Sequence, residues 1–92
     1  MGISYDPEVN AGYLSLVDDA TVSKTIEVSP GVFLDLDGSG TPLGLELLYP
    51  ARELPLSELH KVLPSATVKD LHDQWKSLRR VLNKATNIRR GR

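Results

Sequence analysis

The fold depends on the segment EVSPGVFLDLDGSGTPLGLELL, which spans residues 27–48. Apolar and polar residues alternate on both sides of its Gly-rich centre, so Leu34 and Leu45 are predicted to face one way and Asp35 and Glu46 the other. Glycine accepts the positive φ angles that a tight turn requires. The segment therefore predicts a β-hairpin with one buried face and one acidic face in solvent.

Three more strands are predicted ahead of this hairpin. Residues 3–5 form a short run that ends at Asp6-Pro7, residues 13–17 alternate in polarity, and residues 21–28 are rich in β-branched side chains. Short connections favour antiparallel pairing of consecutive strands. Residues 1–50 are therefore expected to form an antiparallel β-meander of about five strands.

The rest of the chain has helical periodicity. Residues 51–64 are predicted to be a linker with a short helix at 56–63 that lies between two prolines. A longer amphipathic helix is predicted within residues 65–86, followed by a basic tail at 87–92. These elements predict an α+β fold in a single domain, with a small sheet followed by a short helix and a longer C-terminal helix.

The longer helix, expected from about Val68 to about Lys84, carries a narrow apolar stripe. Its apolar residues are spaced by three and four positions, as in a heptad repeat. They are the candidates for a protein interface: Val68, Leu71, Trp75, Leu78 and Leu82. The stripe would be buried against a sheet, either in its own chain or in another copy, and the sequence leaves these alternatives open. We expect a homodimer.

Charge is distributed unevenly along the chain. Residues 1–50 carry eight acidic side chains and one basic one, a net charge of −7, whereas residues 51–92 carry ten basic and four acidic ones, a net charge of +6. Seven basic residues follow Gln74 with no acid among them, and they are the candidates for nucleic-acid contacts: Lys76, Arg79, Arg80, Lys84, Arg89, Arg90 and Arg92. Such residues also complement a helix C-terminus or the acidic half of another copy.

Composition narrows the class of protein. The 92 residues include no cysteine, so neither a disulfide nor a thiolate metal site is expected. No apolar run approaches the ~18 residues of a membrane span. The first residues lack the pattern of a signal peptide, and we expect a cytoplasmic protein without a cofactor.

Four segments carry a resemblance to a known family. They are YDPE at 5–8, YLSL at 13–16, TIEVSPGVFLDLD at 25–37 and PLGLELL at 42–48. Over about residues 3–50 the chain resembles a family of small bacterial proteins catalogued as domain of unknown function 2283. The resemblance implies a small β-meander followed by a helix, with no established activity. Some members look like antitoxin partners of small toxins, which implies a protein partner such as a toxin.

Two other patterns concern site chemistry. Residues 35–46 match the spacing of a calcium-binding loop, with Asp35, Asp37 and Glu46 as oxygen ligands. The same acids suit the solvent face of a hairpin, and we predict no metal site while leaving cation binding there open. His60 and His72 are expected on the surfaces of separate helices.

The sequence therefore predicts a small interaction or regulatory module and not an enzyme. The expected form is a homodimer that binds a protein partner. The alternative is nucleic-acid binding through the basic C-terminal helix and tail.

Overall fold

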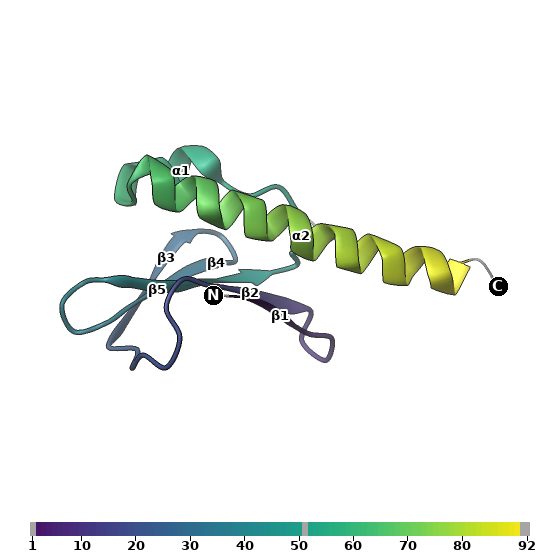
Figure 1. The fold of residues 1–92 in the computed structure, drawn as a ribbon, viewed down its shortest axis with the longest axis horizontal. Coiled ribbons are helices and arrows are strands. Elements are labelled where there is room, and N and C mark those ends of the chain that lie inside the picture. The colour runs from purple at the N-terminus through teal and green to yellow at the C-terminus, as the bar shows by residue number, and fades with distance from the viewer. Residues whose placement is uncertain (1, 51, 91–92) are drawn as a thin grey trace.

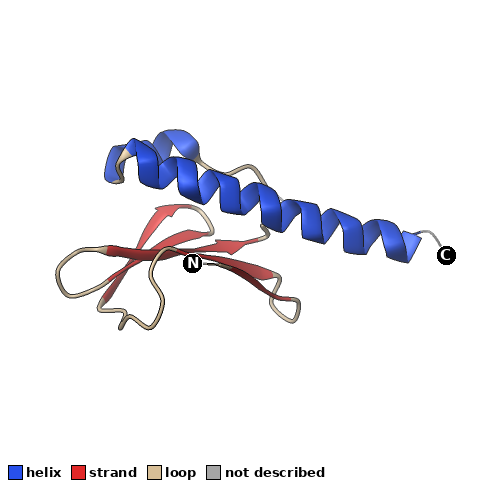
Figure 2. Ribbon diagram, in the orientation of Figure 1, coloured by secondary structure: helices blue, strands red, loops and turns tan. Residues whose placement is uncertain are grey.

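The five strands form one antiparallel sheet, and both helices lie on the same side of it (Figure 1). The computed structural model describes the backbone of residues 2–50 and 52–90, with the side chains in these ranges up to Asn83. The elements are β1 (Ile3–Asp6), β2 (Ala11–Ser15), β3 (Lys24–Ser29), β4 (Val32–Leu36), β5 (Pro42–Leu48), α1 (Leu56–Val62) and α2 (Ser65–Arg90). Sheet and helices make two layers (Figure 2), which confirms the predicted α+β fold class.

The strand order is β1-β2-β5-β4-β3, which corrects the sequential order of a simple meander. The strands β3, β4 and β5 form consecutive hairpins, but β5 then pairs with β2, so that Leu45 lies opposite both Leu14 and Leu34. The physical reason is burial. The apolar strand β5 takes the centre of the sheet, whereas β3, with exposed Lys24 and Thr25, takes an edge.

Two strands have other bounds than predicted. The strand β2 ends at Ser15 because the N–H groups of Leu16 and Val17 both donate to the carbonyl oxygen of Leu43, at 2.8 and 3.1 Å, and the regular ladder stops there. The strand β3 begins at Lys24 because its partner β4 ends at the opposite residue, Leu36.

The turn between β4 and β5 has the predicted geometry. Gly40 has a φ of 86°, in the left-handed region that favours glycine. One carboxylate oxygen of Asp37 accepts the backbone N–H groups of Ser39 and Thr41, at 2.8 and 2.9 Å. Asp37 therefore stabilises the hairpin that the sequence predicts.

Both helices differ from the predicted bounds. The helix α1 ends at Val62, and Leu63 is extended because it precedes Pro64. The helix α2 begins at Ser65 and continues to Arg90, since the sequence places neither Gly nor Pro between them. Residues 87–90 of the expected tail are thus helical, and 91–92 lie outside the described residues. Neither described helix is both long and apolar enough to cross a membrane.

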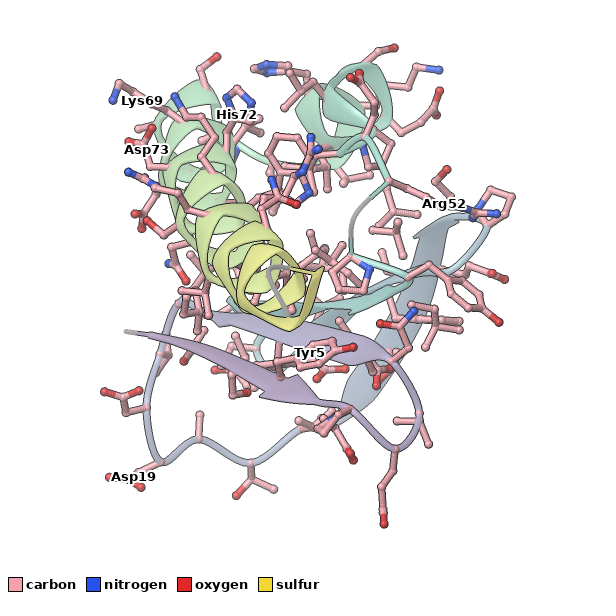
Figure 3. All side chains as sticks on the ribbon, turned by 90° about the vertical axis from the view of Figure 1, so that its right-hand side faces the viewer. Tyr5, Asp19, Arg52, Lys69, His72 and Asp73 are labelled. Carbon is pink, nitrogen blue, oxygen red and sulfur yellow. The ribbon has the colours of Figure 1, made fainter. Side chains whose placement is uncertain are left out.

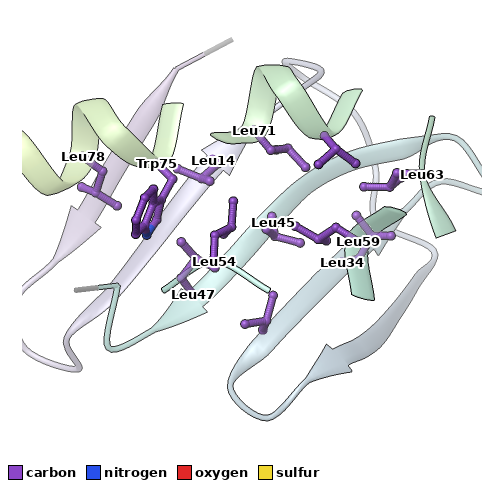
Figure 4. Packing of buried hydrophobic residues seen from close by; sticks show 12 residues of the cluster. Leu14, Leu34, Leu45, Leu47, Leu54, Leu59, Leu63, Leu71, Trp75 and Leu78 are labelled. Carbon is purple, nitrogen blue, oxygen red and sulfur yellow. The ribbon is translucent and has the colours of Figure 1, made fainter. Parts of the chain in front are cut away.

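The core lies between the sheet and the helices (Figure 4). Six leucines in it are at most 1% exposed: Leu14, Leu34, Leu45, Leu59, Leu71 and Leu78. Each such burial contributes about 1.5–3 kcal/mol of transfer free energy. Gly12 permits the close contact of α2 with β2, because a Cβ at Gly12 would lie 2.6 Å from Cδ2 of Leu78.

Candidate protein-interaction surface

Neither helix covers the side of the sheet that faces away from α1 and α2, where the loop between β2 and β3 projects (Figure 1). Tyr13, Glu46 and Phe33 lie side by side on it, in register across β2, β5 and β4, and all three are half-buried. The charged side chains that the described strands place on this side are all acidic. We call this surface the open acidic face, and we define it by Asp6, Tyr13, Glu27, Phe33, Asp35 and Glu46.

Hydrogen bonds fix the position of Asp35 on the open acidic face. The hydroxyl of Tyr13 donates to Oδ2 of Asp35 at 3.0 Å, and the hydroxyl of Thr25 donates to Oδ1 at 2.6 Å. Gly44 lies opposite Asp35, and a Cβ at Gly44 would collide with the Tyr13 ring. Because Gly44 has no side chain, the Tyr13 ring can lie across β5 and reach the carboxylate of Asp35.

The surroundings of Tyr13 disfavour its ionised form. Burial, the hydrogen bond to Asp35, and the negative charges of Asp35 and Glu46 raise the pKa of Tyr13 to about 12, with burial as the largest cause. Tyr13 is therefore neutral at physiological pH. Its proton remains available for the hydrogen bond that holds Asp35.

A shallow hollow of about 370 Å³ lies where the β1–β2 hairpin adjoins β5. Its lining includes Asp6, Val9, Tyr13 and Glu46, and Val9 is 63% exposed. Apolar surface beside two carboxylates suits the apolar stem and charged end of a Lys or Arg side chain.

The apolar stripe of α2 is occupied by its own sheet. Val68, Leu71, Trp75 and Leu78 are buried in the core, and Leu82 packs against it while partly buried. Of the two alternatives that the sequence leaves open, the stripe therefore packs on the sheet of its own chain, and a role of these residues in a protein interface stays a prediction. The stripe packs in its own chain because the apolar side of a small sheet offers the nearest surface that removes it from water.

Trp75 fixes the helical layer to the end of β5. Its indole N–H lies 3.1 Å from the carbonyl oxygen of Pro50 and 3.2 Å from that of Arg52, so it donates to both. His72 is half-buried and stacks on Trp75 with 5.5 Å between ring centroids, whereas His60 is exposed. A hollow of about 270 Å³ beside Trp75 is lined mostly by apolar residues, together with Arg52 and Glu53.

The basic residues of α2 have mixed surroundings. Asp73 and Lys69 are 3.1 Å apart and lie on the side of α2 away from the sheet (Figure 3). Lys76 lies 3.7 Å from the same carboxylate. The guanidinium of Arg79 lies 5.1 Å from the Trp75 ring centroid, and Arg80 is exposed. The other candidates for nucleic-acid contacts lie outside the described side chains: Lys84, Arg89, Arg90 and Arg92. Nucleic-acid binding stays a prediction.

Two of the acids that match the calcium-loop spacing accept hydrogen bonds from different donors. Asp35 accepts hydrogen bonds from Tyr13 and Thr25, whereas Asp37 accepts those of its own turn. Within residues 2–50 and 52–90, no three His, Cys, Asp or Glu residues are grouped as metal ligands. Cation binding by Asp35, Asp37 and Glu46 stays the open alternative to their role as the solvent-facing acids of a hairpin.

The sequence did not reveal the contact between Tyr13 and Asp35. Both residues occupy polar positions of alternating segments, and that signal places them on one face. Their contact depends on β2 pairing with β5, which the alternation does not specify.

Comparison with known proteins identifies a family. A family described as "Protein of unknown function (DUF2283)" matches residues 3–49, which contain all five strands. No curated protein and no solved structure shows significant similarity to the chain.

Proposed function

The chain belongs to the DUF2283 family of proteins of unknown function, and we propose that it is a non-enzymatic interaction module that binds a basic segment of a protein partner. The proposed docking surface is the open acidic face. The observation that supports it most directly is the sign of charge there, because the described strands place carboxylates on this side and no Lys or Arg.

Aromatic side chains support the same surface. Tyr13 and Phe33 are half-buried at its centre, and aromatic residues are enriched where partners dock. Their rings lie on the rigid strands β2 and β4, so little conformational entropy would be lost on binding. A basic partner would gain both apolar contact and charge complementarity.

Hydrogen bonding supports a role in recognition for Asp35. The carboxylate is held on both sides by hydroxyl donors, at 3.0 Å from Tyr13 and 2.6 Å from Thr25. A fixed carboxylate meets a guanidinium or ammonium group with little loss of rotamer freedom.

The test is an NMR titration of the isotope-labelled chain with a short synthetic peptide of alternating Arg and Leu. We expect the largest amide shifts on β2, β4 and β5, and binding that weakens as salt is added. The double variant Glu27→Lys/Glu46→Lys should weaken binding at least tenfold.

The matched control reverses two charges on the helical side, in Glu53→Lys/Glu58→Lys. Its net charge equals that of the first variant, so general electrostatic attraction changes equally in both. Equal weakening in the two variants, or shifts confined to α2, would refute the proposed surface. A DNA duplex titrated in place of the peptide tests the nucleic-acid alternative, for which shifts should gather on α2.

A further inference from the structure

The two edge strands of the sheet differ in how they are protected. The edge strand β3 carries exposed Lys24 and Glu27, and its pairing with β4 shifts register between Glu27 and Ser29. Charged side chains and bulges are features that discourage the addition of a further strand. The other edge strand, β1, also carries an exposed charged residue, Asp6, but it pairs with β2 in regular register along its whole length. Its outer side therefore has the geometry to accept one.

The hydrogen-bonding groups on the outer side of β1 follow from the ladder. The N–H of Ser15 donates to the carbonyl oxygen of Gly2 at 2.8 Å, so Gly2, Ser4 and Asp6 direct their backbone groups toward β2. In an antiparallel pair the residues between them direct theirs the opposite way. The N–H and C=O groups of Ile3 and Tyr5 therefore point to the open edge.

We infer that a second copy of this chain pairs antiparallel with β1, with Ser4 on the twofold axis. In this register Ile3 lies opposite the partner's Tyr5, and Tyr5 lies opposite the partner's Ile3, so all outward groups of both residues are paired. Moving the axis to Tyr5 would place Ile3 opposite the partner's Pro7, which has no N–H to donate. Moving the axis to Ile3 would place Tyr5 opposite the partner's Met1, outside the strand. The axis at Ser4 therefore pairs the most groups within β1.

The position of α2 also bears on a second copy at this edge. The C-terminal part of α2 extends beyond the β1–β2 end of the sheet (Figure 1). A twofold axis perpendicular to the sheet keeps both helical layers on one side. The C-terminal part of each α2 then extends toward the partner on the helical side of the joined sheet, opposite the open acidic face.

The dimer would leave the open acidic face free. The side chains of Ser4 and Asp6 lie on that face, and the pairing uses only backbone groups of Ile3 and Tyr5. Two copies would join their open faces into one continuous acidic surface. This inference therefore stands apart from the proposed function, and failure of either leaves the other intact.

A single cysteine tests the register directly, since the chain has none of its own. Cross-strand residues of a non-hydrogen-bonded antiparallel pair have Cα atoms about 4.5 Å apart, within the range of a disulfide. Ser4→Cys should therefore form a disulfide-linked dimer almost completely under mild oxidation. The control is Ser39→Cys, which is exposed in the β4–β5 turn and should stay largely monomeric. Equal cross-linking of both variants, or none of Ser4→Cys, would overturn the register.

Sedimentation equilibrium tests the pairing without a cross-link. The wild-type chain, of 10.1 kDa, should sediment with twice that mass at micromolar concentration. Tyr5→Pro and Tyr5→Ala both remove the side chain, but only the proline removes the N–H that points to the partner. The dissociation constant should rise at least tenfold in Tyr5→Pro relative to Tyr5→Ala. A monomeric wild type at high micromolar concentration, or equal constants for the two variants, would overturn the inference.

Discussion

The covered face and the open face of the sheet come from the same strands but are fixed by different interactions. On the covered face, Leu14, Leu34 and Leu45 lie in register and are at most 1% exposed. On the open face, Tyr13 and Asp35 are half-buried and are held by hydrogen bonds. The difference indicates that the covered face supplies most of the stability, while the open face can change its chemistry without loss of the fold.

The strongest test of this comparison replaces neighbouring residues of β5. Leu45→Ala should lower the free energy of unfolding by about 2–5 kcal/mol, because it leaves a cavity among buried side chains. Glu46→Ala, on the open face, should cost less than about 0.5 kcal/mol. Urea denaturation of both variants measures the two values, and similar costs would contradict the assignment of stability to the covered face.

Gly12 lies on the covered face and Gly44 on the open face, so the effect of a glycine-to-alanine substitution can be compared between the two faces. Gly12→Ala should cost about 1–3 kcal/mol, because the new Cβ would lie 2.6 Å from Leu78 and 3.3 Å from Pro50, where little can move. Gly44→Ala should cost about 1 kcal/mol, because the Tyr13 ring can turn into solvent and loses mainly its hydrogen bond to Asp35.

A double variant separates collision from other effects of Gly12→Ala. Adding Leu78→Ala removes the side chain that the new Cβ meets. The double variant should therefore lose less stability than the sum of the losses in Gly12→Ala and Leu78→Ala alone. Strict additivity in thermal unfolding would show that contact with Leu78 is not the reason.

The smallest expected effect is the change with pH in the stability that Tyr13 contributes on the open face. The pKa of Tyr13 is raised to about 12 from an ordinary value of 10.0, so the folded state holds this proton more tightly than the unfolded state. The resulting stability is complete below pH 10 and is lost as pH rises from about 10 to 12. Because Tyr13 is partly exposed, screening by solvent reduces this contribution to the free energy of unfolding to about 1 kcal/mol.

Tyr13→Phe provides the control for this pH effect. Denaturant midpoints of the wild type and Tyr13→Phe should converge as pH approaches 12, and absorbance at alkaline pH should show that the variant lacks the last tyrosine to ionise. A wild type whose advantage over Tyr13→Phe grows with pH would contradict the stated direction.

Sequence periodicity was sufficient for the elements and insufficient for their arrangement. Alternation around Asp35 and Glu46 predicts the hairpin, and spacing by three and four predicts the stripe from Val68 to Leu82. Pairing of β5 with β2 depends on long-range burial, which local alternation does not encode. The open acidic face was predictable as an acidic face of one hairpin. The position of Tyr13 on this face, beside Asp35, was not predictable, because it depends on the order of the strands.

The attachment of Trp75 has a practical consequence. As the only tryptophan, it is the sole indole fluorophore of the chain, and its N–H lies within hydrogen-bonding distance of carbonyl oxygens of Pro50 and Arg52. Separation of α2 from the sheet would expose the indole to water and shift its emission to longer wavelength. The emission of a single natural residue can therefore follow the joining of the two layers in real time, during refolding or while a partner binds, without an added label.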